Sequence, residues 1–334
     1  MRGGGRLQRS KHALGARSVL VLLLVMLLMG FLFSLAVSYF IPVETRQRPE
    51  IYYALVIAQE SLMFGLPAYL FILWVRPRYG PVLLGRLHFP PLNIALRTAA
   101  AAILGLWMYE CYTALWMVLL DGTGAALSVP AIPLPESGPQ TVLALLAVAL
   151  VPAILEEVVF RGMVHQGLAR DLKEKTAVWL SALLFAFMHR SLAALPVHIT
   201  LGIVLTLLAA RSGSLQLSML YHFVHNATSL IFSLYARNVV SQMSSEALSA
   251  MNGVDGQGAF SSVLSILPMT VITTVAYIFL IRPLLRKGET NAIENQVIIT
   301  QESDHPKRQW MVAALAALLF LLLLPDYVIG FLPI

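Results

Sequence analysis

Apolar segments that are long enough to cross a lipid bilayer follow one another along almost the whole chain. A transmembrane helix needs about 20 predominantly apolar residues, and roughly nine stretches reach that length. The fifth and sixth stretches are interrupted by Arg190 and Pro196. The pattern predicts an all-α polytopic membrane protein, a helix bundle of about 8–9 transmembrane helices with a mid-membrane cavity. The nine stretches cover residues 18–41, 51–75, 92–120, 140–168, 176–194, 195–210, 214–236, 260–282 and 309–331.

The composition agrees with a chain that lies mostly in lipid. Only 12% of the residues are charged and 58% are hydrophobic, whereas a soluble globular protein carries about a quarter charged residues. The net charge of +6 at pH 7 lies mostly between the apolar segments, where it indicates membrane topology. We therefore expect the lipid bilayer, and no nucleic acid, as a partner. The single cysteine, Cys111, cannot form a disulfide within the chain.

The distribution of Lys and Arg among the loops predicts the orientation in the membrane. Residues 121–140 contain no Lys or Arg, and residues 237–260 contain only Arg237. These loops alternate with basic ones, as nine crossings with a cytoplasmic N-terminus and an outer C-terminus require. Arg46 and Arg48, in the loop 42–50, are the exception. The basic clusters are Arg2, Arg6, Arg9, Lys11 and Arg17; Arg76, Arg78 and Arg86; Arg170, Lys173 and Lys175; Arg211; and Arg282, Arg286, Lys287, Lys307 and Arg308.

The chain divides into three parts. Residues 1–139 hold three membrane spans, residues 140–236 carry nearly all the polar residues that lie in apolar sequence, and residues 237–334 add a loop and two further spans. The first span follows basic residues, as a signal peptide does. Its apolar run exceeds the roughly 7–15 residues of a signal peptide, so we predict an uncleaved anchor. A short helix is expected around 241–251.

Two adjacent carboxylates stand in the apolar stretch LVPAILEEVVFRGM, residues 150–163. Glu157 and Arg161 are four residues apart, in the order that favours an ion pair on one helical face. Glu156 points about 100° away and has no such partner on its own helix. A carboxylate in a bilayer must be protonated, find a partner on another helix or face water. We therefore expect Glu157 to stabilise the fold and Glu156 to carry a function, with Pro152 bending the helix just before them.

Two histidine motifs follow. In FAFMH, Phe185 precedes His189 by four residues, so its ring can pack beside the imidazole and fix its orientation. In YHFVHN, His222 and Asn226 are four apart and project from one face. His225 points about 60° from His222 and is the rival candidate. Each motif alone also fits a simple hydrogen bond between helices.

Depth in the membrane brings the three motifs together. At 1.5 Å per residue, Glu156 lies about 20 Å from the cytoplasmic end of its helix at Arg170. His189 lies about 20 Å from Lys175, and His222 about 15 Å from Arg211. A Glu and two His at one depth can activate a water for hydrolysis, with or without a metal ion.

The three motifs together resemble a known family of membrane enzymes. EEVVFR fits the pattern E-E-x-x-x-R, FAFMH fits F-x-x-x-H, and HFVHN fits H-x-x-x-N. Their order and spacing resemble the CPBP family of intramembrane proteases, named for CAAX proteases and bacteriocin-processing enzymes and also called the Abi family. The resemblance covers roughly residues 140–230. In eukaryotes, members remove the last three residues of prenylated CAAX proteins; in bacteria, some mature or resist bacteriocins.

The resemblance implies a role for each motif residue. Glu156 and His189 would activate the attacking water, with Glu157 and Arg161 supporting them. His222 and Asn226 would hold the oxyanion. If the protein is a zinc metalloprotease, Glu156, His189 and His222 would form the ligand set, although the sequence has no H-E-x-x-H signature. A Glu–His pair that activates water directly would instead leave Glu156 free to act as the base.

The resemblance predicts an intramembrane CAAX-type endopeptidase that cleaves a membrane-associated peptide or protein. We expect an integral, multi-pass protein of a prokaryotic cell membrane. One alternative is a non-catalytic relative that acts in peptide binding, bacteriocin immunity or complex assembly. Another is a transporter with a proton relay, although the chain lacks the repeated halves of such proteins. Glu60 and Glu110 also stand in apolar segments, and we expect them to line the same cavity or to pair with Arg97.

Overall fold

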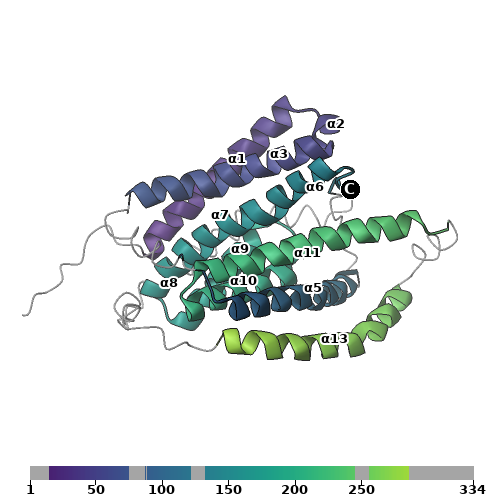
Figure 1. Cartoon of the computed structure of the whole chain (residues 1–334). Helices are drawn as coiled ribbons and strands as arrows, with labels where there is room; N and C mark the ends of the chain where they lie inside the picture. The colour runs from purple at the N-terminus through teal and green to yellow at the C-terminus, as the bar shows by residue number, and fades with distance from the viewer. Residues whose placement is uncertain (1–14, 75–86, 88, 122–131, 245–255, 286–334) are drawn as a thin grey trace, which may run out of the picture.

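Every element that the structure describes is a helix, which confirms the predicted all-α class. The computed structural model describes residues 15–74, 87, 89–121, 132–244 and 256–285. The helices lie side by side as a bundle (Figure 1). The predicted ninth span, residues 309–331, lies outside the described residues, as does most of the short helix expected around 241–251. The bounds are α1 Ala16–Phe40, α2 Val43–Arg46, α3 Pro49–Glu60, η1 Ser61–Gly65, α5 Leu92–Asp121, α6 Gly138–Leu145, η2 Leu146–Leu150, α7 Val151–Val159, η3 Phe160–Val164, α8 His165–Asp171, α9 Glu174–Met188, α10 Leu195–Ser212, α11 Leu215–Ser241 and α13 Gly256–Leu284.

Helices in the described part of the chain are long and apolar enough to make this an integral membrane protein. Six helical segments among the described residues have the length and the hydropathy of a membrane span. The segment that carries the two carboxylates is the longest of them, because α6, η2, α7, η3 and α8 follow one another without a break from Gly138 to Asp171. The six spans are Ala16–Phe40, Pro49–Trp74, Leu92–Met117, Gly138–Asp171, Leu195–Ser212 and Leu267–Leu284.

The fifth predicted span ends earlier than its apolar sequence suggests. Helix α9 has 15 residues, which is about 22 Å at 1.5 Å per residue, less than the roughly 30 Å hydrocarbon core of a bilayer. It ends because Arg190 adopts a left-handed backbone conformation with φ of 51°. The turn that leads into α10 is held by the protein, since the Trp116 indole of α5 donates to the Leu192 carbonyl at 2.9 Å. Non-helical backbone at membrane depth needs such a partner.

Contacts between helix ends agree with the predicted alternation of the spans. At one end of the bundle, the Ala16 backbone N–H donates to Asp171 at 2.9 Å, and Arg211 pairs with Glu174 at 3.0 Å. At the other end, the Gln140 amide donates to Glu50 at 3.0 Å. Loops expected on the same side of the membrane therefore lie together. Which end faces the cytoplasm stays a prediction.

Buried tyrosines join the helix that carries the third motif to the rest of the bundle. The hydroxyls of Tyr109 on α5, Tyr221 on α11 and Tyr277 on α13 lie 3.1–3.4 Å from one another. Three hydroxyls in such a triangle can each donate one hydrogen bond and accept another. A Cβ atom at Gly105 would lie 2.5 Å from the Tyr221 hydroxyl, so glycine there makes room for the cluster. This cluster fixes α11, and with it His222, against α5 and α13.

Candidate active site

The two carboxylates lie in an irregular stretch of helix. Glu156 and Glu157 are both buried on α7, and a π-helical turn lies on each side: η2 before and η3 after. Pro152 follows η2 by two residues, and its missing N–H explains why regular hydrogen bonding lapses there. Single π-helical turns inside α-helices occur frequently at functional sites. The sequence predicted a lost hydrogen bond and a bend at Pro152, but neither of the two π-helical turns.

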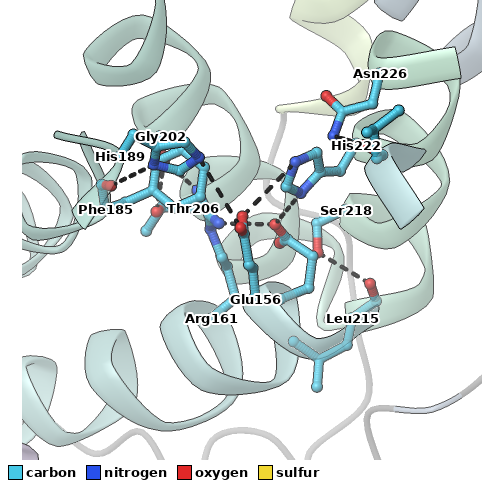
Figure 2. Close-up of polar contacts among 12 residues, drawn as sticks. Glu156, Arg161, Phe185, His189, Gly202, Thr206, Leu215, Ser218, His222 and Asn226 are labelled. Carbon is cyan, nitrogen blue, oxygen red and sulfur yellow. Dashed lines mark hydrogen bonds and ion pairs between the residues drawn. The ribbon is translucent and has the colours of Figure 1, made fainter. Parts of the chain in front are cut away.

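The predicted ion pair between Glu157 and Arg161 is present and buried. The Arg161 Nη1 atom lies 2.7 Å from Glu157 Oε1, and both side chains are fully buried. The Nη2 atom of the same guanidinium donates to the Gly202 carbonyl on α10 at 3.1 Å. The guanidinium carbon also lies 4.5 Å from the centre of the Phe185 ring. Arg161 therefore joins its own helix to both α9 and α10 (Figure 2).

His222 bridges the two carboxylates. Its Nδ1 atom lies 3.0 Å from Glu157 Oε1, and its Nε2 atom lies 3.8 Å from Glu156 Oε2. Because an ionised carboxylate can only accept, Nδ1 carries the proton and Nε2 faces Glu156. The contact with Glu157 was not predicted from the sequence. It gives Glu157 a second task, which is to orient His222.

His189 reaches Glu156 from the opposite side. It caps the C-terminus of α9, and its Nδ1–H donates to the Phe185 carbonyl at 2.8 Å. Its Nε2 atom lies 3.9 Å from Glu156 Oε1. The Phe185 ring packs against the imidazole, with ring centres 4.6 Å apart, as the four-residue spacing predicts. The His189 side chain is 25% exposed, against 6% for Glu156 and 3% for His222, so the site opens beside His189.

The structure separates the two histidines of the third motif. His225 is buried against the Tyr109 ring of α5, with ring centres 5.3 Å apart, and so does not replace His222 beside Glu156. Asn226 points to the same side as His222, as predicted (Figure 2). Its Nδ2 atom donates to the Val148 carbonyl in η2 at 3.0 Å. One amide hydrogen of Asn226 therefore holds α11 to η2.

The Glu156 carboxylate lies between the two imidazoles without a direct hydrogen bond to either (Figure 2). Separations of 3.8 and 3.9 Å exceed hydrogen-bonding distance, and polar groups at this spacing are commonly bridged by water. Glu156 Oε2 is buried and has no hydrogen-bond partner among the described residues. The carboxylate oxygens and the two histidine Nε2 atoms are all hydrogen-bond acceptors. A water molecule between them can donate one hydrogen to Glu156 and the other to a histidine.

The described side chains do not converge as a metal ion requires. Within residues 15–74, 87, 89–121, 132–244 and 256–285, no group of three His, Cys, Asp or Glu side chains is arranged to hold one. Glu156, His189 and His222 carry donor atoms of the type that zinc prefers, but their placement does not fit a common ion. The zinc site stays a prediction.

The two other membrane carboxylates lie in different surroundings. Glu60, at the C-terminus of α3, lies close enough to Glu156 for their charges to interact, and its Oε2 atom is buried without a hydrogen-bond partner in the described part. Glu60 therefore lies near Glu156, as the expectation of a shared cavity requires. Glu110 lies instead on the exposed surface of α5. No ion pair joins Arg97 to either carboxylate within the described ranges.

The fold and the site together define an integral membrane protein with a buried Glu/His centre. Residues 138–228 match the family model described as Type II CAAX prenyl endopeptidase Rce1-like. The matched segment contains all three motifs, which confirms the resemblance predicted from them and supports a peptidase. No curated protein and no solved structure matches the chain.

Gly202 provides a test of how tightly the site is packed. A Cβ atom there would lie 3.0–3.1 Å from Cα, Cβ and the carbonyl oxygen of Ala182 on α9, and backbone atoms cannot move aside cheaply. We expect Gly202→Ala to destabilise the protein by about 1–3 kcal/mol and to shift the carbonyl that accepts from Arg161. Unfolding in detergent, followed by loss of helical signal, measures this. Gly138→Ala is the matched control, because nothing lies within 4 Å of its Cβ position. Equal stability of the two variants would contradict the packing argument.

Proposed function

We propose that the protein is an intramembrane endopeptidase that hydrolyses a peptide bond of a membrane-associated substrate with a water activated by Glu156 and His189. The observation that carries the proposal is the position of the Glu156 carboxylate, which lies 3.9 Å from His189 Nε2 and 3.8 Å from His222 Nε2. The match of residues 138–228 to the CAAX protease family supports a peptidase.

The protonation of the site favours a water as the nucleophile. The Phe185 carbonyl and the Glu157 carboxylate each accept a hydrogen bond from Nδ1 of a histidine, so both neutral rings present an Nε2 lone pair. A water between Glu156 and His189 donates one hydrogen to each and keeps an oxygen lone pair free for attack.

The reaction then requires only proton transfers through Glu156. As the water oxygen bonds to the substrate carbonyl carbon, Glu156 accepts the water proton. The tetrahedral intermediate collapses when Glu156 returns that proton to the leaving nitrogen, and the C–N bond breaks. The products are a carboxylic acid and an amine, and Glu156 is regenerated as a carboxylate.

The tetrahedral intermediate carries a negative charge on the former carbonyl oxygen, the oxyanion. In this scheme, side chains of α11 stabilise it. The second amide hydrogen of Asn226 is one donor, because the first is bonded to the Val148 carbonyl. His222 lies on the same face of α11, and the hydrogen bond from its Nδ1 atom to the Glu157 carboxylate fixes the direction of its Nε2 atom. Preorganised donors in a site of low dielectric constant stabilise developing charge strongly.

The substrate is expected to approach from the side of His189. That side chain is the exposed member of the site, and the neighbouring residues 191–200 are only half-buried. A peptide anchored in the membrane can enter there without crossing the bundle. A C-terminal CAAX-like sequence next to a lipid is the first substrate class to test.

The test is cleavage of a panel of membrane-tethered and C-terminally prenylated peptides by the full-length protein in lipid nanodiscs. The double variant Glu156→Gln/His189→Gln serves as the blank, and products are identified by mass spectrometry. We expect cleavage at one defined bond by the wild type and none by the blank, with metal content measured on the same samples. Failure of the wild type to cleave any peptide, or equal cleavage by both proteins, would reject the proposal and favour a non-catalytic, peptide-binding role.

A further inference from the structure

We propose that His198 is a positioning residue that holds the imidazole of His189 in its working orientation by ring stacking. The two ring centres are 3.9 Å apart and the ring planes lie at 29°. His198 comes from the first turn of α10, and no motif of the sequence singles it out. The inference rests on the proposed function, because His189 is the residue that it positions.

His189 needs restraint from outside its own helix. It stands at the end of α9, immediately before Arg190 with its left-handed φ of 51°, so no further helical turn supports it. The hydrogen bond from Nδ1 to the Phe185 carbonyl restrains the ring at one atom and leaves it free to swing about that bond. Phe185 packs against the ring from within α9, at a tilt of 57°. His198 is a contact from a second helix, and it lies nearly parallel to the ring.

The connection between the two helices keeps the stack in register. The backbone N–H of Ala194 donates to the Ser191 hydroxyl at 3.2 Å, and the Leu192 carbonyl accepts from Trp116 of α5 at 2.9 Å. The loop that joins His189 to His198 is thus tied to itself and to a third helix. The chain therefore presents His198 to His189 as part of a fixed turn.

The Nδ1 atom of His198 does not explain the position of the ring. Its Nδ1 atom is buried and has no hydrogen-bond partner within the described part of the chain. Its ring also lies at 81° to that of Phe185, with centres 6.4 Å apart, an edge-to-face arrangement common among aromatic rings. The contacts are those of a flat aromatic surface. A phenylalanine at this position would preserve them.

The first arm of the test compares His198→Ala with His198→Phe in the cleavage assay. Displacement of a catalytic group by about 1 Å can cost about 10²-fold in rate. We expect His198→Ala to lower kcat by about 10-fold or more, with KM little changed, and His198→Phe to restore most of the rate. A general loss of folding would also lower the unfolding temperature, which is measured on both variants. Equal kcat in wild type and His198→Ala would overturn the proposal, as would an equal loss in the Ala and Phe variants.

The second arm does not depend on cleavage. Diethyl pyrocarbonate acylates exposed imidazole nitrogens, and mass spectrometry of the full-length protein in nanodiscs follows its reaction at His189. Because His198 covers one face of that ring, we expect labelling of His189 to be several-fold faster in His198→Ala and unchanged in His198→Phe. An unchanged rate in His198→Ala would overturn the positioning role. A protein that cleaves no peptide but shows the expected labelling would reject the proposed function and support the stacking contact.

Discussion

Glu156→Gln is expected to lower kcat for peptide cleavage by about 10²–10⁴-fold, the usual range for loss of a general base. Glutamine has nearly the same shape as glutamate, but its amide cannot accept a proton from water. Glu156 is almost fully buried and makes no direct hydrogen bond that the substitution would break within the described residues. The fold and KM should therefore change little. Initial rates over a range of substrate concentrations separate the two parameters.

Glu110→Gln is the matched control for this substitution. It removes the same charge from another helix of the membrane region, but Glu110 is exposed on α5, whereas Glu156 is buried. We expect its kcat and KM to stay within about twofold of the wild type, as is usual for surface substitutions. Wild-type activity in Glu156→Gln, in protein shown to be folded, would remove Glu156 from the mechanism.

Contacts within one helix followed from the sequence. The spacing of four residues predicted that Glu157 pairs with Arg161 and that Phe185 packs against His189, and both contacts are present. This succeeds because helical geometry fixes which side chains share a face. The rise per residue also placed Glu156, His189 and His222 at a similar depth. The structure brings these three side chains together.

Contacts between helices did not follow from the sequence. The bond from His222 to Glu157 joins residues 65 positions apart, and that from Asn226 to the Val148 carbonyl joins residues 78 positions apart. Helical periodicity gives the face of each side chain but not the rotation of one helix against another. The Val148 contact also involves a π-helical turn, where the backbone hydrogen-bonding pattern changes. In the sequence, Pro152 is the one residue that indicates irregular hydrogen bonding near this turn.

The two adjacent glutamates do not divide structure and function between them as the sequence predicted. Glu157 was expected only to fix the helix through Arg161. In the structure its Oε1 atom accepts from both Arg161 and His222, so it stabilises the fold and orients a residue of the proposed site with the same oxygen. His198 was overlooked because it belongs to no motif and its ring contact depends on the turn after α9.

Arg161→Met is expected to destabilise the protein by about 3–5 kcal/mol, the usual cost of removing one partner of a buried ion pair. Arg161 and Glu157 are both fully buried, so the remaining carboxylate would keep its desolvation penalty and lose its counter-ion. The substitution also removes the hydrogen bond to the Gly202 carbonyl and the contact with the Phe185 ring. Denaturant unfolding in mixed micelles measures the free energy of unfolding.

The double variant Glu157→Gln/Arg161→Met separates the charge effect from the loss of packing. Removing both charges leaves no unpaired carboxylate, and such pairs can often be replaced with little loss of stability. We therefore expect the double variant to be more stable than Arg161→Met, and the double-mutant cycle gives the coupling energy between the residues. Activity should not recover with stability, because a glutamine at position 157 can donate as well as accept and so no longer fixes the proton of His222 on Nδ1. If Arg161→Met unfolds like the wild type, the buried pair has no stabilising role.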